Sequence, residues 1–296
     1  MAVSIMMLRV LENDFGFKVD EKVDVTLGHS LGEFAALIAA GILDYGDALR
    51  IIRRRGEAMM KCTLEAREAE NGAEFGMMAL IVEPDRLKSL IETIEEFLGY
   101  TPFPAAGSDF DEDSHMPAIQ QVLIANINSK NQIVLSGNID RIQSLLTHLR
   151  QFGGHDPRAV RLNSDSPFHS PIMMPAKTVM ANLMSKTKLN FPGITKCIMN
   201  VTGQPAENAD DVKDLLTRQC TETVRWWDSI KYADQKLKVR RWVGVGPGKV
   251  GRNLVGKEVG MKGRDSVKGG GVWGITNPHE VDDFLRQLEE TDYIRE

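Results

Sequence analysis

Hydrophobic and polar residues alternate with period two along residues 23–27, and this alternation predicts a β-strand. Residues 33–40 are unbroken helix-forming sequence, whereas residues 44–62 form an amphipathic pattern with one apolar and one charged stripe. Asp44 and Asp47 lie where a helix N-terminus favours negative charge. This part of the chain therefore predicts a strand followed by two helices.

A second group of elements follows in the order strand, helix, strand, strand, helix, strand. The pattern places the strands at residues 75–82, 122–127, 132–135 and 159–162, and the helices at residues 83–98 and 139–152. This order is typical of a ferredoxin-like fold. Residues 100–117 are rich in proline, glycine and acidic residues, which predicts a surface loop. We therefore expect a ferredoxin-like α+β subdomain over residues 71–163.

The residues between the first strand and the first helix spell GHSLGEF, at positions 28–34. A G-x-S-x-G sequence between a strand and a helix is typical of a nucleophile elbow, a tight turn that lifts the serine hydroxyl clear of the backbone. The N-terminus of the following helix directs N–H groups toward an oxyanion formed at Ser30. The motif predicts a serine acyl-enzyme; the alternative is an ordinary turn in which Ser30 caps a helix.

The helix predicted at residues 44–62 has a basic residue on its apolar stripe. Arg55 shares this stripe with Ile51 and Met59, whereas Arg54 belongs to the charged stripe. Because a guanidinium stays charged, an inward-facing arginine needs an anionic partner. The pattern leaves open a structural salt bridge, an arginine that snorkels from the edge of the stripe, and a clamp for a substrate carboxylate.

Further segments along the chain accompany the GHSLGEF motif. They are RG at 55–56, SPFHSPIM at 166–173, RQ at 218–219 with VRW at 224–226, and VGPGKV at 245–250. In this order and at this spacing they resemble the malonyl-CoA:acyl carrier protein transacylase family. The resemblance covers almost the whole chain.

The resemblance implies a catalytic role for several matching residues. Ser30 would be the nucleophile, and His169 would be the general base that activates it. A backbone carbonyl orients the histidine in this family, and the matching residue is Gln219. Leu31 would supply an oxyanion N–H group.

The resemblance also implies substrate-binding residues. Arg55 would pair with the free carboxylate of the malonyl group, and His29 is a further candidate contact. Phe168 resembles the residue found in malonyl-selecting members and would leave little room for a branched acyl group.

The implied reaction is a ping-pong acyl transfer for fatty acid synthesis. Malonyl-CoA, a coenzyme A thioester, would acylate Ser30, and the phosphopantetheine thiol of acyl carrier protein would then take the malonyl group. These groups need no metal and no redox cofactor. We expect a monomer, located in the mitochondrial matrix if this is a stand-alone eukaryotic enzyme and in the cytoplasm otherwise.

The fold class that follows is α/β. We expect a doubly wound, mostly parallel sheet domain over residues 1–70 and 164–296, with the ferredoxin-like subdomain inserted into it. The glycine-rich run at residues 262–271 predicts a flexible loop within the larger domain.

One departure from the family concerns the N-terminus. The family begins with a strand and a Gly-Gln-Gly loop upstream of the elbow, and that loop supplies a second oxyanion donor; this chain has neither. We therefore expect an N-terminally truncated member, and a catalytically impaired carrier-binding fragment is one alternative. A serine esterase or thioesterase is the other, although Arg55 has no role in it.

Composition excludes some classes of function. The net charge of −5 gives no electrostatic basis for binding nucleic acid. Cys62, Cys197 and Cys220 are scattered without metal-ligand spacing, so we expect reduced thiols. No apolar run is long enough to span a membrane, and no signal or transit peptide is visible.

Overall fold

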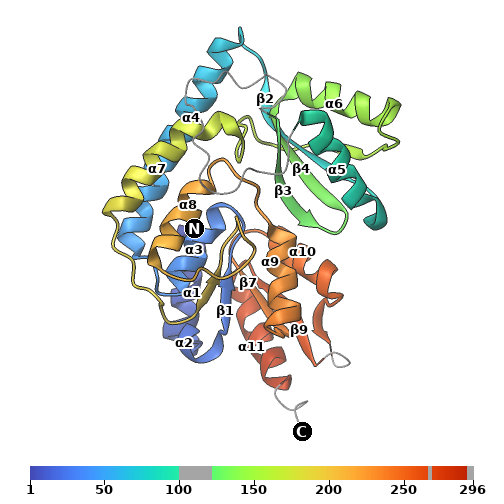
Figure 1. The fold of residues 1–296 in the computed structure, drawn as a ribbon. Coiled ribbons are helices and arrows are strands. Elements are labelled where there is room, and N and C mark those ends of the chain that lie inside the picture. Colours follow the sequence, from blue (N-terminus) through green and yellow to red (C-terminus); the bar gives the residue numbers. More distant parts are fainter. Residues whose placement is uncertain (100–121, 266–268, 292–296) are drawn as a thin grey trace. The chain divides into compact units, whose positions relative to one another are not determined.

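The computed structural model describes residues 1–99, 122–265 and 269–291 (Figure 1). The acidic loop predicted at residues 100–117 lies outside these residues. The chain divides into two compact units, which we describe separately. Unit 1 comprises Met1–Ile52, Leu183–Leu216 and Arg225–Glu296, and unit 2 comprises Arg53–Asn182 and Thr217–Val224.

Unit 1 combines short strands with helices. Its elements are α1 (Ala2–Phe15), α2 (Val19–Lys22), β1 (Val25–Leu27), α3 (Leu31–Ala39), β6 (Lys196–Ile198), α9 (Trp226–Lys231), β7 (Arg241–Val245), α10 (Val250–Val259), β8 (Gly263–Asp265), β9 (Gly270–Ile275) and α11 (Val281–Glu290). Three helices contribute residues to both units: α4 (Tyr45–Ala69), α7 (Met174–Lys186) and α8 (Ala209–Arg218).

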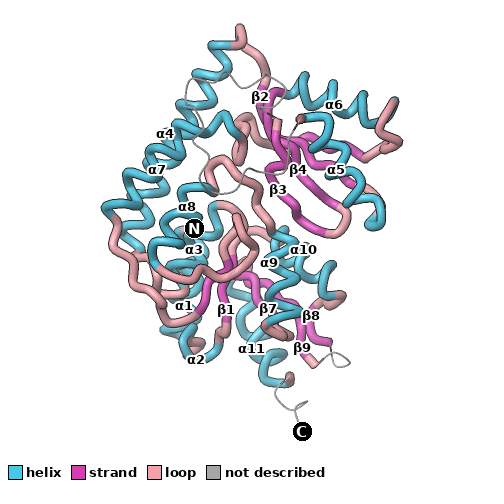
Figure 2. Tube along the Cα trace, viewed as in Figure 1, coloured by secondary structure: helices cyan, strands magenta, loops and turns pink. Residues whose placement is uncertain are grey.

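The strands of unit 1 pair mostly in parallel. β1 runs parallel to β6, with Leu27 opposite Ile198, and β7 runs parallel to β9. Figure 2 shows β7, β8 and β9 in magenta. Within the described residues these strands form a two-stranded and a three-stranded sheet. Parallel strands linked through helices confirm the α/β class predicted from the sequence.

The apolar faces of α1 and α11 meet on β9. Phe284 of α11 lies with its ring centroid 5.9 Å from that of Phe17 and 5.9 Å from that of Trp273, both in edge-to-face geometry. Leu11 and Ile275 complete this cluster together with Val281. Burying these side chains removes large apolar surfaces from water and stabilises the unit.

Unit 2 contains a four-stranded antiparallel sheet. Its elements are β2 (Phe75–Ile81), α5 (Leu87–Leu98), β3 (Leu123–Ser129), β4 (Gln132–Asn138), α6 (Ile139–Gln151) and β5 (Arg158–Arg161). The strand order is β3-β4-β2-β5, which is the ferredoxin-like order. The predicted boundaries at residues 71 and 163 stay a prediction, because unit 2 also includes parts of α4, α7 and α8.

The two faces of this sheet carry different partners. The helices α5 and α6 lie side by side on one face (Figure 1), and each buries the apolar stripe of its own amphipathic sequence. The other face presents Met77, Ala79, Ala125 and Val134, against which Phe168 packs. The segment before α9 extends the sheet edge, because the Val224 N–H donates to the Ala125 carbonyl at 2.8 Å.

The flexible loop predicted at residues 262–271 is wrong at Gly263–Asp265, which form β8, and from Gly270 onward, where β9 begins; residues 266–268 lie outside the described residues. β8 pairs antiparallel with β9, with Gly263 opposite Val272. The glycines here permit close packing: a Cβ on Gly270 would lie 2.0 Å from the Arg240 carbonyl oxygen, and one on Gly271 would lie 2.5 Å from the Trp273 ring. These two glycines are therefore required because neighbouring atoms leave no room for a Cβ. The sequence pattern gives no information about such contacts.

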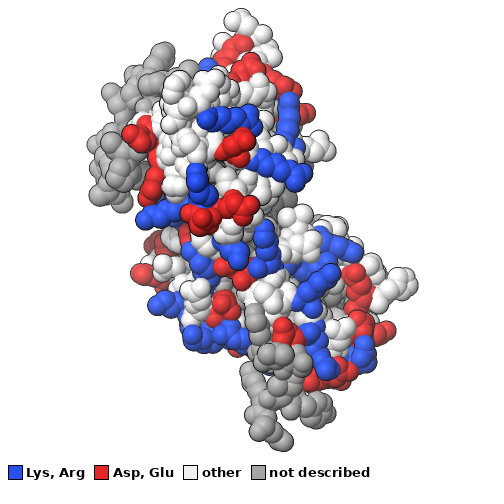
Figure 3. Space-filling view, turned by 90° about the vertical axis from the view of Figure 1, so that its right-hand side faces the viewer, with Lys and Arg blue, Asp and Glu red and all other residues white. Residues whose placement is uncertain are grey.

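The molecular surface carries charges of both signs. On the face shown in Figure 3, basic and acidic side chains are interspersed. Among the helices of the described residues, none is both long enough and apolar enough to cross a membrane.

Candidate active site

Ser30 lies in the turn between β1 and α3, with φ 52° and ψ −112°. A non-glycine residue seldom adopts a positive φ, and such strained residues cluster at functional sites. Strand, turn and helix follow one another here as the nucleophile elbow requires. The local geometry therefore agrees with the predicted elbow.

The two glycines of the motif play different parts. A Cβ on Gly28 would lie 2.0 Å from the Gly32 carbonyl oxygen, so only glycine fits at position 28. A Cβ on Gly32 would meet no heavy atom within 4 Å outside its own helix backbone. The tightness of the turn thus depends on Gly28.

The N–H groups of the elbow have distinct acceptors. The Ser30 N–H donates to the side-chain oxygen of Asn200 at 2.7 Å. The N–H groups of Gly32 and Glu33 donate to the carbonyl oxygens of His29 and Ser30 at 2.8 and 3.0 Å. Leu31 is the first residue of α3, so its N–H has no carbonyl partner within the helix. This is the group that the resemblance assigns to the oxyanion hole.

Asn200 bonds to the elbow at several points, although it was not among the site residues predicted from the sequence. Besides accepting from Ser30, its side-chain amide donates to the Gly28 carbonyl at 2.7 Å, and its main-chain N–H donates to the Glu33 carboxylate at 2.6 Å. Asn200 follows β6, the parallel neighbour of β1, and the carboxyl ends of parallel strands meet at one edge. A polar residue two positions after the partner strand was the signal that pointed to it.

His29 lies beside Ser30 but its ring is engaged elsewhere. The imidazole packs edge-to-face on Trp226, with 5.5 Å between ring centroids. The half-buried ring is therefore held by an aromatic contact. Its contact with substrate stays a prediction.

In unit 2, the structure joins His169 to Gln219. His169 Nδ1 lies 2.7 Å from the main-chain carbonyl oxygen of Gln219, and the His169 side chain is buried. Because a carbonyl oxygen only accepts, Nδ1 must carry the proton. The neutral imidazole then has its lone pair on Nε2, which is the tautomer that a general base needs. The predicted contact with the Gln219 carbonyl is thus present, whereas the roles of both residues in catalysis stay predictions.

Gln219 also contacts Arg55, through its side chain. Arg55 is 7% exposed, and its Nη2 donates to Gln219 Oε1 at 3.0 Å. The sequence placed Arg55 on an apolar stripe, and the side chain is indeed buried. This bond orients the guanidinium. The role of the Gln219 side chain was not anticipated, because the contact joins residues 164 positions apart in sequence.

Phe168 precedes the histidine and packs on the open face of the unit 2 sheet. Its partly buried side chain contacts the cluster formed by Met77, Ala79, Ala125 and Val134. The structure therefore groups Arg55, Phe168, His169 and Gln219 within unit 2, and His29, Ser30 and Leu31 within unit 1.

The three cysteines are free and buried, as the sequence predicted for reduced thiols. Burial raises the pKa of the Cys62 thiol and raises that of Cys197 well above its usual range. Burial also raises the pKa of Cys220, and the nearby Arg55 guanidinium opposes this with a smaller effect. Burial and a raised pKa both lower the reactivity expected of these thiols.

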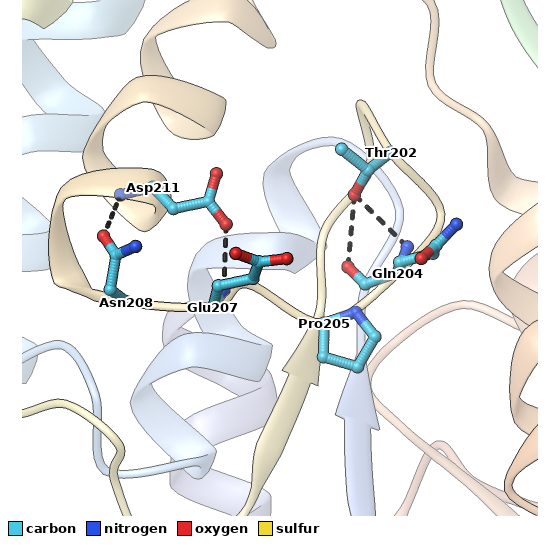
Figure 4. Close-up of a pocket in the computed structure, with 6 residues that line it drawn as sticks. All are labelled: Thr202, Gln204, Pro205, Glu207, Asn208 and Asp211. Carbon is cyan, nitrogen blue, oxygen red and sulfur yellow. Dashed lines mark hydrogen bonds between the residues drawn. The ribbon is translucent and has the colours of Figure 1, made fainter.

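A shallow depression of about 410 Å³ lies in unit 1 and contains none of the predicted site residues (Figure 4). Its polar groups bond to one another: Thr202 bonds to Gln204, and the Glu207 N–H donates to Asp211 at the start of α8 at 2.9 Å. In the described part of the chain, no three His, Cys, Asp or Glu side chains are grouped so that they could hold a metal ion.

Comparisons with known proteins identify the family. No family model matches the chain. The polyketide biosynthesis malonyl CoA-acyl carrier protein transacylase of Bacillus velezensis is 31% identical over 240 residues, covering 80% of this chain and 69% of that protein. The chain belongs to the malonyl CoA-acyl carrier protein transacylase family. Proteins of this family are acyltransferases, so the chain is assigned to this class of enzyme.

Two further members of the transacylase family bear this out. The Escherichia coli K12 transacylase is 30% identical over 223 residues, covering 75% of this chain and 62% of that protein. The crystal structure of the acyl-carrier-protein S-malonyltransferase from Bartonella henselae has a TM-score of 0.73 and 30% identity, covering 98% of this chain and 79% of that one. The chain thus spans about two thirds of the length of these curated relatives. All three are bacterial, so they give no support to the mitochondrial location expected for a eukaryotic enzyme.

Proposed function

We propose that the chain transfers a malonyl group from malonyl-CoA to the phosphopantetheine thiol of an acyl carrier protein, through an acyl-enzyme on Ser30. Family membership supports the substrates, since the relatives are named malonyl CoA-acyl carrier protein transacylases. The single observation that carries the covalent mechanism is the strained conformation of Ser30 in a strand–turn–helix elbow.

In the proposed first half-reaction, Nε2 of His169 takes the proton of the Ser30 hydroxyl while the oxygen attacks the thioester carbonyl carbon. The tetrahedral intermediate collapses, the carbon–sulfur bond breaks, and coenzyme A leaves as a thiol with the proton from His169. The 2.7 Å contact between His169 Nδ1 and the Gln219 carbonyl supports this role, because it fixes the required tautomer. In the second half-reaction the carrier thiol attacks the ester, with the same proton transfers.

The Leu31 N–H is proposed to stabilise the oxyanion that forms on the thioester oxygen. Its place at the start of α3 supports this assignment, because the group is outside the hydrogen-bond ladder of the helix and lies at the positive end of the helix dipole. A donor of this kind lowers the activation barrier by about 2.7–4 kcal/mol in acyl-transfer enzymes.

Arg55 is proposed to bind the free carboxylate of the malonyl group. Its burial supports this assignment, since a guanidinium placed away from water favours an anionic partner and its planar fork matches a carboxylate. Phe168 is proposed to limit the size of the acyl group and His29 to contact the substrate. No metal or redox cofactor takes part in these steps.

A transfer assay tests the proposal. The chain is incubated with radiolabelled malonyl-CoA and a phosphopantetheinylated acyl carrier protein, and label on the carrier is measured against the Ser30→Ala variant. Label transfer that depends on Ser30 supports the proposal. Release of free malonate with no labelled carrier favours the esterase or thioesterase alternative, and carrier binding without acylation of Ser30 favours the carrier-binding alternative.

A further inference from the structure

We infer that Asn200 is a positioning residue that holds the nucleophile elbow in its active geometry. This inference rests on the proposed role of Ser30. The Asn200 side chain uses both ends of its amide on the elbow: Oδ1 accepts from the Ser30 N–H at 2.7 Å, and Nδ2 donates to the Gly28 carbonyl at 2.7 Å. One side chain therefore spans the residues on either side of His29.

Asn200 is itself held at its main chain. Its N–H donates to the Glu33 carboxylate at 2.6 Å, and its carbonyl accepts from the Arg225 N–H at 2.8 Å. Asn200 and Glu33 are each 1% exposed, so these bonds form away from water, where an unmade hydrogen bond is costly. Asn200 thus joins the start of α3 and the residue before α9, and its amide is fixed in direction.

The hydrogen bonds of Asn200 hold Ser30 in its strained conformation. A φ of 52° at a serine is unfavourable for an isolated chain, so surrounding contacts must hold it. The Ser30 N–H is bound by Asn200, and the next N–H along the chain is that of Leu31, the proposed oxyanion donor. A change at Ser30 therefore moves both the nucleophile oxygen and the oxyanion donor. Arg55, the proposed carboxylate ligand, belongs to another element and keeps its own contacts.

Because the elbow and Arg55 are held by different contacts, Asn200→Ala should affect the acylation rate and leave substrate binding nearly unchanged. The rate of Ser30 acylation by malonyl-CoA should fall by roughly 10- to 100-fold, because a misplaced reacting group costs up to about 100-fold. The Kd for malonyl-CoA should stay within about threefold of the parent value. Single-turnover intact mass spectrometry measures the acylation rate, and its dependence on malonyl-CoA concentration separates the rate from the Kd.

Asn138→Ala is the matched control. Asn138 is also buried, and its side-chain oxygen accepts from the N–H groups of Asp140 and Arg141 at the start of α6. The same substitution there removes comparable bonds without touching the elbow. It should leave the acylation rate within about threefold of the parent. An Asn200→Ala protein that acylates at the parent rate, or loses rate only as much as the control does, overturns the inference.

Amide hydrogen exchange at Ser30 gives a measurement that needs no acylation. With ¹⁵N-labelled protein, the Ser30 amide should be protected in the parent and should exchange at least about tenfold faster in Asn200→Ala. Equal exchange in the two proteins overturns the inference. A parent that shows this protection but is never acylated contradicts the proposed function and still supports the positioning contact. If Asn200→Ala does not fold, the parent protein decides: a Ser30 amide that exchanges there as fast as an unprotected amide overturns the inference.

Discussion

The guanidinium of Arg55 and the side chain of Gln219 form one buried hydrogen bond, Nη2 to Oε1 at 3.0 Å. The main-chain carbonyl of the same glutamine accepts from His169 Nδ1 at 2.7 Å. Gln219 therefore contacts the proposed carboxylate ligand with its side chain and the proposed base with its backbone. The two contacts can be separated, because any residue at position 219 keeps the carbonyl.

Gln219→Ala should impair malonyl recognition more than it impairs the base. The variant loses the bond that orients Arg55, worth about 1 kcal/mol or roughly a fivefold rise in the KM for malonyl-CoA. Steady-state transfer to the carrier protein measures this, with acetyl-CoA as the comparison substrate. Acetyl transfer should change little; an equal loss with both acyl groups would show that the side chain supports His169 instead.

Arg55→Ala should remove the preference for a carboxylated acyl group. Losing hydrogen bonds to a charged partner costs about 1.5–3 kcal/mol, so kcat/KM for malonyl-CoA should fall by roughly 10- to 150-fold. The rate with acetyl-CoA should be unchanged or higher. Competition between the two thioesters in one reaction measures the ratio directly.

Arg54→Ala is the control for this variant. Arg54 lies next to Arg55 on α4 but is exposed and pairs with Glu57 at 3.2 Å. Such exposed pairs contribute about 0–1 kcal/mol, so Arg54→Ala should keep both the stability and the malonyl preference. A similar loss of selectivity in the two variants would contradict the role of Arg55.

Two glycine substitutions in the elbow should differ in their effect on folding. In Gly28→Ala the new methyl group would lie 2.0 Å from the Gly32 carbonyl oxygen, and such overpacking typically costs about 1–3 kcal/mol. Gly32→Ala meets open space in a helix, where alanine is favoured by up to about 1 kcal/mol. Urea unfolding should therefore show a lower midpoint for Gly28→Ala and an unchanged or higher one for Gly32→Ala. Equal losses would contradict the geometry of the turn.

The cysteines should react slowly in the native protein. Since burial raises the pKa of Cys62, Cys197 and Cys220, less thiolate is present at a given pH, and the thiolate is the reactive form. Titration with a disulfide reagent at pH 8 should be roughly tenfold slower or more before denaturation than after it. The denatured chain should give all 3 thiols. Rapid native labelling of all of them would contradict their burial.

Local sequence patterns predicted the elements on which the candidate site is built. The alternation before Gly28 and the helix after it located the elbow, and the apolar stripe placed Arg55 on the inward face of its helix, where the structure buries it. The ferredoxin-like order also followed from the sequence, because nearly continuous apolar runs marked the buried strands β2, β3 and β4, and amphipathic stripes marked the helices α5 and α6.

Contacts between distant segments could not be predicted in this way. Asn200 reaches Ser30 across 170 positions, and the Gln219 side chain reaches Arg55 across 164. Glu33 shows the same limit, since a glutamate in the first turn of a helix is expected at the surface but is buried here against the Asn200 N–H. Such bonds depend on how strands and loops meet in three dimensions, and periodicity along the chain holds no information about that.

Intact mass spectrometry of the chain after brief exposure to malonyl-CoA tests the covalent mechanism most directly. The proposed mechanism predicts a malonyl adduct on the parent, none on Ser30→Ala, and an adduct that forms about 10²- to 10⁴-fold more slowly on His169→Ala because the general base is lost. His279→Ala, which changes an exposed histidine, should acylate like the parent. A folded parent chain that acquires no adduct, or an equal adduct on Ser30→Ala, would show that Ser30 is not the nucleophile of this mechanism.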